Sequence, residues 1–256
     1  MVLVISVPED AHARTVLDVL KKREVEACLL DFRKFPIQTE IAMTDSGQAA
    51  GLSLVLEGRE INMCDVRSIL YRRPQPPTAD DALKPEIQEY IVRESNMLLD
   101  AISNVAPALW VSDPDAVHIA SRKPYQLRIA SELGFRVPPY CIGNSPAIAA
   151  NFLDTLPANS GVAVKPLNKP FVRVDEKGSP FASFTQKLDK DDIRERLGRI
   201  KNCPLILQEY IEKSFELRIT VVGSKVFMCA IHSQKSEKTR IDWRRYDIPN
   251  TPHEIY

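Results

Sequence analysis

The stretch of residues 161–234 constrains the fold most, because it holds two β-rich runs separated by only two residues. The runs are Glu216–Val222 and Lys225–Ile231, and Gly223 and Ser224 link them. A two-residue link that begins with glycine is typical of a β-hairpin, since such turns require a positive φ that glycine adopts readily. We therefore expect this part of the chain to form an antiparallel lobe, in which residues 164–167 and 216–222 share one sheet.

A strand that ends in a lysine precedes the hairpin. Val162–Lys165 is a short apolar run, and a second apolar run leads into residues 208–211, Gln-Glu-Tyr-Ile. A buried strand with a lysine at its end, beside a hairpin that carries Glu216 and Arg218, suits a bound polyphosphate. The same residues are also consistent with an ordinary antiparallel sheet that has a solvated lysine and a surface Glu/Arg pair.

Composition excludes several classes of protein. The 256 residues include 34 basic and 34 acidic side chains, so no global attraction to nucleic acid or to an anionic membrane is expected. Hydrophobic residues make up 44%, enough for a buried core, yet no apolar run approaches the roughly 20 residues that span a bilayer. The five cysteines are scattered without a CxxC pattern, and the four histidines lack metal-ligand spacing. We expect reduced thiols in a cytoplasmic protein.

The N-terminal part has the pattern of a small parallel α/β domain. Expected strands are residues 2–7, 27–30, 52–56, 60–63, 66–70 and 108–111, with 52–56 and 60–63 forming a hairpin. The first two flank an amphipathic segment, a β-α-β pattern that predicts parallel strands. The strand at 66–70 leads into Arg72 and Arg73. Because ligands bind at the carboxyl ends of parallel strands, these arginines are candidate ligand contacts, although a surface pair is equally consistent.

Helical patterns occupy much of the middle of the chain. Expected helices are residues 85–102, a segment headed by Lys123 that ends near Gly134, residues 146–156 and the charged segment 189–200. We expect an α/β fold of three domains: an N-terminal domain of residues 1–112, a small central domain of residues 113–160 and a lobe of residues 161–256.

Most of the chain resembles the ATP-grasp enzymes, and in particular the ribosomal-peptide maturases that form side-chain esters or amides in microviridin- and graspetide-type precursors. The matching motifs keep their order: Tyr71-Arg72-Arg73-Pro74, Asp113-Pro114-Asp115, Lys123, Gln126-Leu127, Val164-Lys165-Pro166-Leu167, Gln208-Glu209-Tyr210-Ile211, Glu216-Leu217-Arg218 and Asp242-Trp243-Arg244. Each motif alone is weak, but the ordered set is specific for ATP-grasp.

The resemblance implies an N-terminal pre-ATP-grasp domain followed by a nucleotide-binding region. It implies ATP and Mg²⁺ as cofactors, and a precursor peptide as partner, with a homodimer as a further option. The resemblance places Lys123 and Lys165 on the triphosphate and makes Gln208, Glu209, Tyr210 and Ile211 the hinge that binds adenine. Glu209 or Glu216 is implied to bind the ribose, and Arg218 is the implied catalytic residue. The residues implied to contact the peptide are Arg72, Arg73, Asp242 and Arg244. Alternatively, the two lysines are solvent-exposed and Arg218 forms a surface ion pair with Glu216.

The implied reaction is activation of a carboxylate by ATP. A peptide Asp or Glu side chain attacks the γ-phosphate, and a Ser or Thr hydroxyl or a Lys amine then attacks the acyl phosphate. Such chemistry depends on positioning and charge neutralisation, which agrees with the lack of a Ser-His-Asp or Cys-His arrangement in the sequence. Two alternatives are a RimK-like ligase that adds glutamate or another amino acid, and a nucleotide- or peptide-binding module without turnover.

Two departures from the family pattern concern the metal and the phosphates. The late acidic residue and Glu-x-Asn pair that hold Mg²⁺ in ATP-grasp enzymes are not found before Tyr256, and the expected phosphate-covering segment, residues 168–180, contains only Gly178 as glycine. We therefore expect residues 1–256 to bind nucleotide but to be inactive or severely impaired. We expect a longer form to restore Mg²⁺-dependent hydrolysis.

Overall fold

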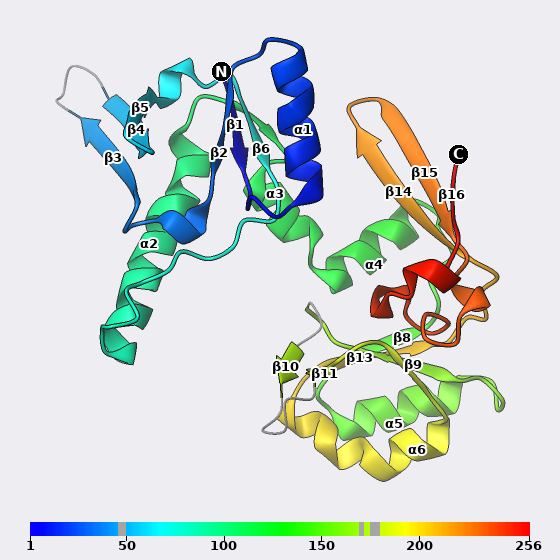
Figure 1. Cartoon of the computed structure of the whole chain (residues 1–256). Coiled ribbons are helices and arrows are strands. Elements are labelled where there is room, and N and C mark those ends of the chain that lie inside the picture. Colours follow the sequence, from blue (N-terminus) through cyan, green and yellow to red (C-terminus); the bar gives the residue numbers. More distant parts are fainter. Residues whose placement is uncertain (46–49, 169–171, 175–179) are drawn as a thin grey trace. The chain divides into compact units, whose positions relative to one another are not determined.

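The computed structural model describes residues 1–45, 50–168, 172–174 and 180–256, and the chain divides into two units at Ala120 (Figure 1). The units are Met1–Ala120 and Ser121–Tyr256. Each has its own buried apolar cluster. In the part of the chain that the structure describes, no helix is long and apolar enough to cross a membrane. Most of the expected phosphate-covering segment, including Gly178, lies outside the described residues.

The Met1–Ala120 unit contains a four-stranded parallel sheet, which confirms the predicted parallel domain. Its strands, in spatial order, are β2 (Ala27–Leu30), β1 (Val2–Ile5), β6 (Ser68–Tyr71) and β7 (Leu109–Val111). Three successive residues of β1, Leu3, Val4 and Ile5, are fully buried, because helices and loops cover both faces of such a sheet. The first crossover is α1 (Ala11–Lys22), and Asp10 caps it by accepting the Ala13 N–H at 2.8 Å.

A second, antiparallel sheet completes the core of this unit. It consists of β3 (Thr39–Asp45), β4 (Ala50–Leu56) and β5 (Arg59–Asn62). The hairpin of β4 and β5 was predicted, but β3 was not, because most of its side chains are exposed and it lacks a long apolar pattern. Leu54 and Ile61 pack into the same cluster as Leu99 and Ile102 of α2 (Pro85–Val105). The short helix α3 (Pro114–Ala120) ends the unit.

The Ser121–Tyr256 unit begins with α4 (Lys123–Glu132) and is built on an antiparallel sheet. The strands lie in the order β12 (Gln186–Leu188), β9 (Val162–Lys165), β13 (Leu205–Glu209) and β8 (Tyr140–Gly143). The helices α5 (Pro146–Thr155) and α6 (Lys190–Arg196) lie on the same side of this sheet (Figure 1). Their residues Leu153 and Ile193 pack with Val162 and Leu207 to form the core. The strands β10 (Val172–Val174) and β11 (Pro180–Ala182) form a separate two-stranded antiparallel sheet.

The predicted hairpin forms β14 (Glu216–Val222) and β15 (Lys225–Ile231), with Gly223 at φ +59° in its turn. These strands form a separate sheet with β16 (His253–Ile255). The expectation of one antiparallel sheet containing both β9 and β14 is therefore wrong. Both edges of β9 are occupied, by β12 and β13, so β14 has no edge of β9 to pair with.

The units also differ from the three domains that we expected. The observed division follows Ala120 rather than residue 112. The expected boundary at residue 160 falls inside one sheet, because β8 before it and β9 after it both pair with β13. Between β15 and β16 the chain contains three short 3-10 turns. The buried residues of this segment are all polar; they are Ser233, Ser236, Thr239, Asp242 and Thr251.

Candidate functional site

A pocket of about 620 Å³ in the Ser121–Tyr256 unit collects most of the predicted nucleotide-binding residues. Predicted residues that line it are Lys165, Gln208, Glu209, Tyr210, Ile211, Glu216, Asp242 and Arg244. Thr185 and Lys213 also line it, although neither was among the predicted site residues. The volume lies within the range of small-molecule sites in proteins.

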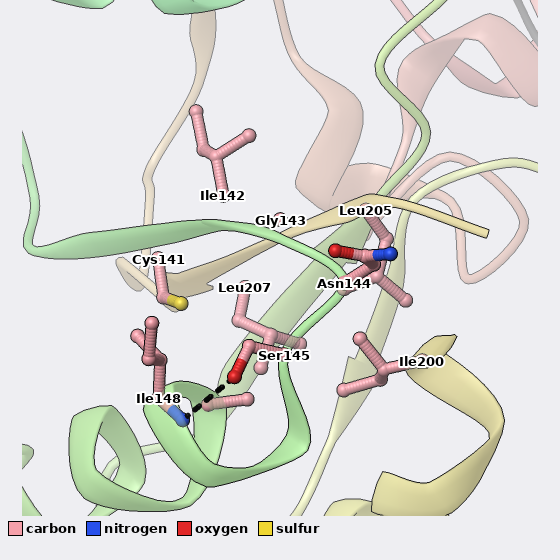
Figure 2. A pocket seen from close by; sticks show the side chains of 10 residues that line it. Cys141, Ile142, Gly143, Asn144, Ser145, Ile148, Ile200, Leu205 and Leu207 are labelled. Atoms are coloured by element: carbon pink, nitrogen blue, oxygen red, sulfur yellow. Dashed lines mark hydrogen bonds between the residues drawn. The ribbon is translucent and has the colours of Figure 1, made fainter. Parts of the chain in front are cut away.

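The sheet of β9 and β13 forms one side of this pocket. Because successive side chains of a strand face opposite ways, one set of side chains faces the pocket and the other set faces the helices. Leu205 and Leu207 of β13 point toward α5, where they line a second, apolar pocket of about 170 Å³ together with Cys141 (Figure 2). Gln208 follows Leu207 and lines the larger pocket on the opposite face. An apolar core on one face thus fixes the polar side chains on the other.

Lys165 and Gln208 form the polar floor of the large pocket. The Lys165 Nζ donates to Gln208 Oε1 at 2.6 Å, and the buried Gln208 donates through Nε2 to the Pro138 carbonyl at 3.4 Å. Burial lowers the pKa of Lys165, and the nearby charges of Lys213 and Arg244 lower it further. Two of the three N–H donors of Lys165 have no partner among the described residues, so they can bind a ligand.

In the predicted hinge, residues 208–211, two main-chain N–H groups are already bonded to carbonyls of the protein. The Glu209 N–H donates to the Pro139 carbonyl and the Tyr210 N–H to the Gly161 carbonyl, both at 2.9 Å. The Lys187 ammonium lies 4.4 Å from the centre of the Tyr210 ring. In the described part of the chain, the Ile211 N–H has no protein partner. Ile211 therefore offers the free hinge donor, while Tyr210 has a main-chain bond and a cation over its ring.

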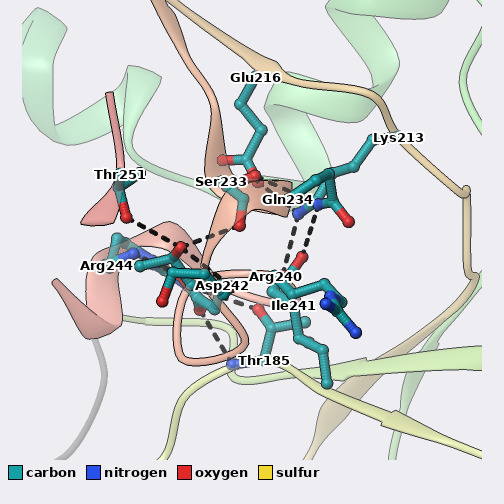
Figure 3. A network of polar contacts seen from close by, with 12 residues as sticks. Thr185, Lys213, Glu216, Ser233, Gln234, Arg240, Ile241, Asp242, Arg244 and Thr251 are labelled. Atoms are coloured by element: carbon teal, nitrogen blue, oxygen red, sulfur yellow. Dashed lines mark hydrogen bonds and ion pairs between the residues drawn. The ribbon is translucent and has the colours of Figure 1, made fainter. Parts of the chain in front are cut away.

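A second side of the pocket is built around the buried carboxylate of Asp242 (Figure 3). Asp242 accepts the Thr185 N–H at 3.1 Å and the Arg244 Nε at 2.8 Å, and it also forms an ion pair with Arg244 Nη2. Burial by itself raises the pKa of a carboxyl group, but the Arg244 and Thr185 hydrogen bonds outweigh it and lower the pKa of Asp242 to about 2. Asp242 is therefore ionised, and its negative charge holds Arg244 in place.

Lys213 and Glu216 form the other polar pair of this side (Figure 3). The Lys213 Nζ is in an ion pair with Glu216 and also donates to the Ile241 carbonyl at 3.0 Å. The fully buried Ser233 donates to Glu216 Oε1 at 3.1 Å. This arrangement could not be predicted from the sequence, because Ser233 lies 17 residues from Glu216 and belongs to no motif.

Two of the three carboxylates that line the pocket, Glu216 and Asp242, do not fit a Mg²⁺ site. Among the described residues, no group of three or more His, Cys, Asp or Glu side chains could hold a metal ion. Glu216 is paired with Lys213, and Asp242 with Arg244. Mg²⁺ requires carboxylate oxygens that are free to coordinate it.

Other predicted site residues lie elsewhere. Arg218 is an exposed residue of β14 that does not line the large pocket. Arg72 and Arg73 belong to the Met1–Ala120 unit, where Arg72 Nε donates to Asp10 Oδ1 at 3.1 Å and Arg73 has a φ of +46°. The Lys123 Nζ does not line the pocket and instead donates to three main-chain carbonyls.

Comparison with protein families identifies the N-terminal unit. Residues 1–118 match the MvdD pre-ATP grasp domain. No curated protein matches the chain.

Solved structures resemble almost the whole chain. A RiPP-associated ATP-grasp ligase from Chryseobacterium gregarium, solved with ADP and a leader and core peptide, is 26% identical, with a TM-score of 0.86 over 95% of this chain and 72% of its own. The macrocyclase MdnC from Microcystis aeruginosa, bound with precursor peptide MdnA, is 24% identical, with a TM-score of 0.83 over 91% of this chain and 76% of its own. The ATP-grasp ligase PsnB, complexed with a precursor variant, Mg and ADP, is 20% identical, with a TM-score of 0.68 over 99% of this chain and 75% of its own.

The order of the motifs, the pocket that collects them and the match of the N-terminal unit agree with one another. Residues 1–118 thus belong to the MvdD pre-ATP grasp domain family, and almost the whole chain is similar to RiPP-associated ATP-grasp ligases.

Proposed function

We propose that the large pocket binds ATP and that the chain is an ATP-dependent ligase that forms side-chain esters or amides in a ribosomal precursor peptide. One observation carries this proposal: Lys165, the hinge residues and Arg244, which are far apart in sequence, line a single pocket. The similar ligase from Chryseobacterium gregarium was solved with ADP and a leader and core peptide, which supports both ligands.

The charges of the pocket suit a nucleotide that carries several negative charges. Lys165 keeps two N–H donors without a partner among the described residues, and Arg244 uses Nε and Nη2 on its protein partners. The Nη1 donors of Arg244 have no partner there. Charge-assisted bonds from these groups to phosphate oxygens are stronger than neutral hydrogen bonds. Ile211 supplies the free main-chain donor for the adenine, and Gln208 keeps Lys165 directed into the pocket.

The reaction proceeds in two displacements. A carboxylate oxygen of the peptide attacks the γ-phosphorus, the bond to the bridging oxygen breaks, and ADP leaves. A hydroxyl or amine of the same peptide then attacks the acyl carbon, loses its proton and releases phosphate. The protein contributes position and charge rather than a covalent intermediate. In this proposal Arg244 contacts the phosphates. The roles of Arg218 at the transferring group and of Arg72, Arg73 and Asp242 at the peptide stay predictions from the family resemblance.

The Mg²⁺ that the family resemblance implies does not enter this account. Of the three carboxylates that line the pocket, Glu216 and Asp242 are paired with cationic side chains, which leaves only Glu209, and the described residues hold no group of three that could bind a metal ion. No step is therefore assigned to a metal.

Nucleotide binding is tested by calorimetric titration of ADP into the wild-type chain and the Lys165→Met variant. Loss of hydrogen bonds to a charged group predicts a decrease in affinity of about ten- to a hundredfold. Lys201→Met is the matched control, because Lys201 is an exposed lysine of the same unit outside the pocket. Equal ADP affinity in all three proteins contradicts the assigned site.

Catalysis is tested by ADP release with peptides encoded beside the gene, followed by mass spectrometry for loss of water from the peptide. Peptide-dependent release with such a loss supports the ligase. Release that depends on free glutamate instead favours the RimK-like alternative. Nucleotide binding without turnover under both conditions favours a binding module.

A further inference from the structure

The apolar cavity behind the large pocket has the properties of a separate binding site. Its volume is about 170 Å³, and it is bounded by β8, β13, α5 and the 3-10 helix η3 (Leu197–Asn202) (Figure 2). Leu207 of β13 lines this cavity, whereas the next residue, Gln208, lines the large pocket. The two cavities therefore lie back to back, on opposite faces of one strand.

The lining of this cavity is mostly aliphatic. None of its ten lining residues, all of which belong to the described part of the chain, has a charged side chain. A charged ligand would lose its hydration there without gaining a counter-charge, which is unfavourable. Six of the ten are aliphatic; they are Ile142, Ile148, Ala149, Ile200, Leu205 and Leu207. The cavity thus selects an uncharged, apolar occupant.

The few polar groups of the cavity do not change this preference. Ser145 is already used by the fold, because its Oγ accepts the Ile148 N–H at 3.4 Å and caps α5 (Figure 2). Burial raises the pKa of the Cys141 thiol, so this group is uncharged at neutral pH. A buried water needs two to four polar partners, and a thiol is a weak one. Water therefore gains little by filling the cavity.

The size and the opening of the cavity suit a small ring. An apolar cavity of about 150 Å³ that was engineered into another protein stays dry and binds benzene. Ile148 lines the cavity and is 62% exposed, so the cavity reaches solvent beside it, whereas Ala149 and Leu207 are almost fully buried and form the inner wall. An empty space leaves the lining atoms without partners on one side, and an occupant supplies those contacts.

We propose that this cavity is a binding site for a small uncharged apolar molecule of about the size of benzene. The molecule packs against the aliphatic side chains of β13 and α5 and lies beside the Cys141 thiol. The site is distinct from the large pocket, and the inference does not rest on the nucleotide binding proposed above.

The first test is a titration of benzene into the protein, followed by calorimetry or by NMR. The wild type is expected to bind with a dissociation constant below about 1 mM. Ala149→Leu places extra methyl groups inside the cavity and should weaken binding by at least about tenfold. Ala147→Leu is the matched control, because Ala147 is exposed on the same helix and does not line the cavity. Undiminished binding in Ala149→Leu, or no binding by the wild type near the solubility limit of benzene, overturns the proposal.

The second test uses the wild type alone, so it also decides the case in which Ala149→Leu does not fold. Methyl methanethiosulfonate modifies free thiols, and peptide mass spectrometry gives the rate at each cysteine. At a benzene concentration about ten times its dissociation constant, modification of Cys141 should slow roughly tenfold, because only the empty cavity admits the reagent. Cys64 and Cys203 are exposed and lie outside the cavity, so their rates should not change. An unchanged rate at Cys141 overturns the proposal.

Discussion

The two sides of the large pocket are stabilised by different kinds of interaction. The side formed by β9 and β13 rests on an apolar core that includes Leu153, Val162 and Leu207, all nearly inaccessible to solvent. The side formed by residues 213–251 has buried residues that are mostly polar, such as Thr239 and Asp242. We refer to them as the apolar-backed side and the polar-backed side.

The difference shows how each side keeps its ligand-facing residues in place. Apolar packing is non-directional, so on the apolar-backed side it sets the positions of whole strands. Alternation along each strand then determines which side chains face the pocket. Hydrogen bonds are directional, so the polar-backed side sets the orientation of single groups such as the Arg244 guanidinium. Substitutions on the two sides should therefore have different consequences.

The largest effect is expected for Leu207→Ala on the apolar-backed side. Leu207 is 1% exposed, and its truncation leaves a cavity beneath the floor of the pocket. Loss of transfer energy together with the cavity should lower the free energy of unfolding of this unit by about 2–5 kcal/mol. Chemical denaturation measures the change. Leu133→Ala, at a residue that is 71% exposed, is the control, and an equally large effect there would refute the assigned core.

A smaller effect is expected for Thr239→Val on the polar-backed side. The buried Thr239 hydroxyl donates to the Ser233 carbonyl at 2.9 Å and lies 3.1 Å from the Thr251 hydroxyl. Valine keeps the shape but leaves these partners unpaired, at a cost of about 1–3 kcal/mol. The free energy of unfolding should fall by that amount. Because Ser233 binds Glu216, ADP affinity should also fall. A variant as stable as the wild type would show that the hydroxyl contacts do not support this side.

The charge of Asp242 gives the polar-backed side a pH dependence in the acid range. Its pKa is about 2 in the folded protein, against an ordinary value of 3.8. The unfolded chain therefore takes up a proton at higher pH than the folded protein, so this stabilisation is complete above about pH 5 and is lost as the pH falls toward 2. Denaturation curves at several pH values should show the decline in the wild type. Asp242→Asn should lack this component, and an identical decline in the variant would exclude Asp242 as its source.

The smallest effect is expected at the ion pair of Lys187 with Glu212. The two side chains are 37% and 77% exposed, so solvent screens their attraction. Glu212→Gln should change the free energy of unfolding by less than about 1 kcal/mol. Lys187→Met should have more influence on the ligand than on stability, because it uncovers the Tyr210 ring. A fluorescence titration of Tyr210 would detect that difference, and a large loss of stability in Glu212→Gln would contradict the assigned exposure.

The local pattern of the sequence was sufficient for the elements that depend on near neighbours. Apolar runs predicted β1, β2, β6 and the pair β9 and β13, and Gly223 predicted the turn of the hairpin, because these features depend on strand alternation and turn geometry. The motif order likewise brought Lys165 and residues 208–211 to one site before the structure showed them in one pocket.

Only the tertiary structure decided which strands pair and which polar groups meet. β14 lies in a different sheet from β9 because both edges of β9 are taken, and no local pattern contains that information. Lys123 binds carbonyls 43 to 45 residues away, and Ser233 reaches Glu216 across 17 residues. Carbonyl acceptors exist at every residue, so the sequence alone cannot indicate which of them converge on a given lysine. That depends on the path of the folded backbone.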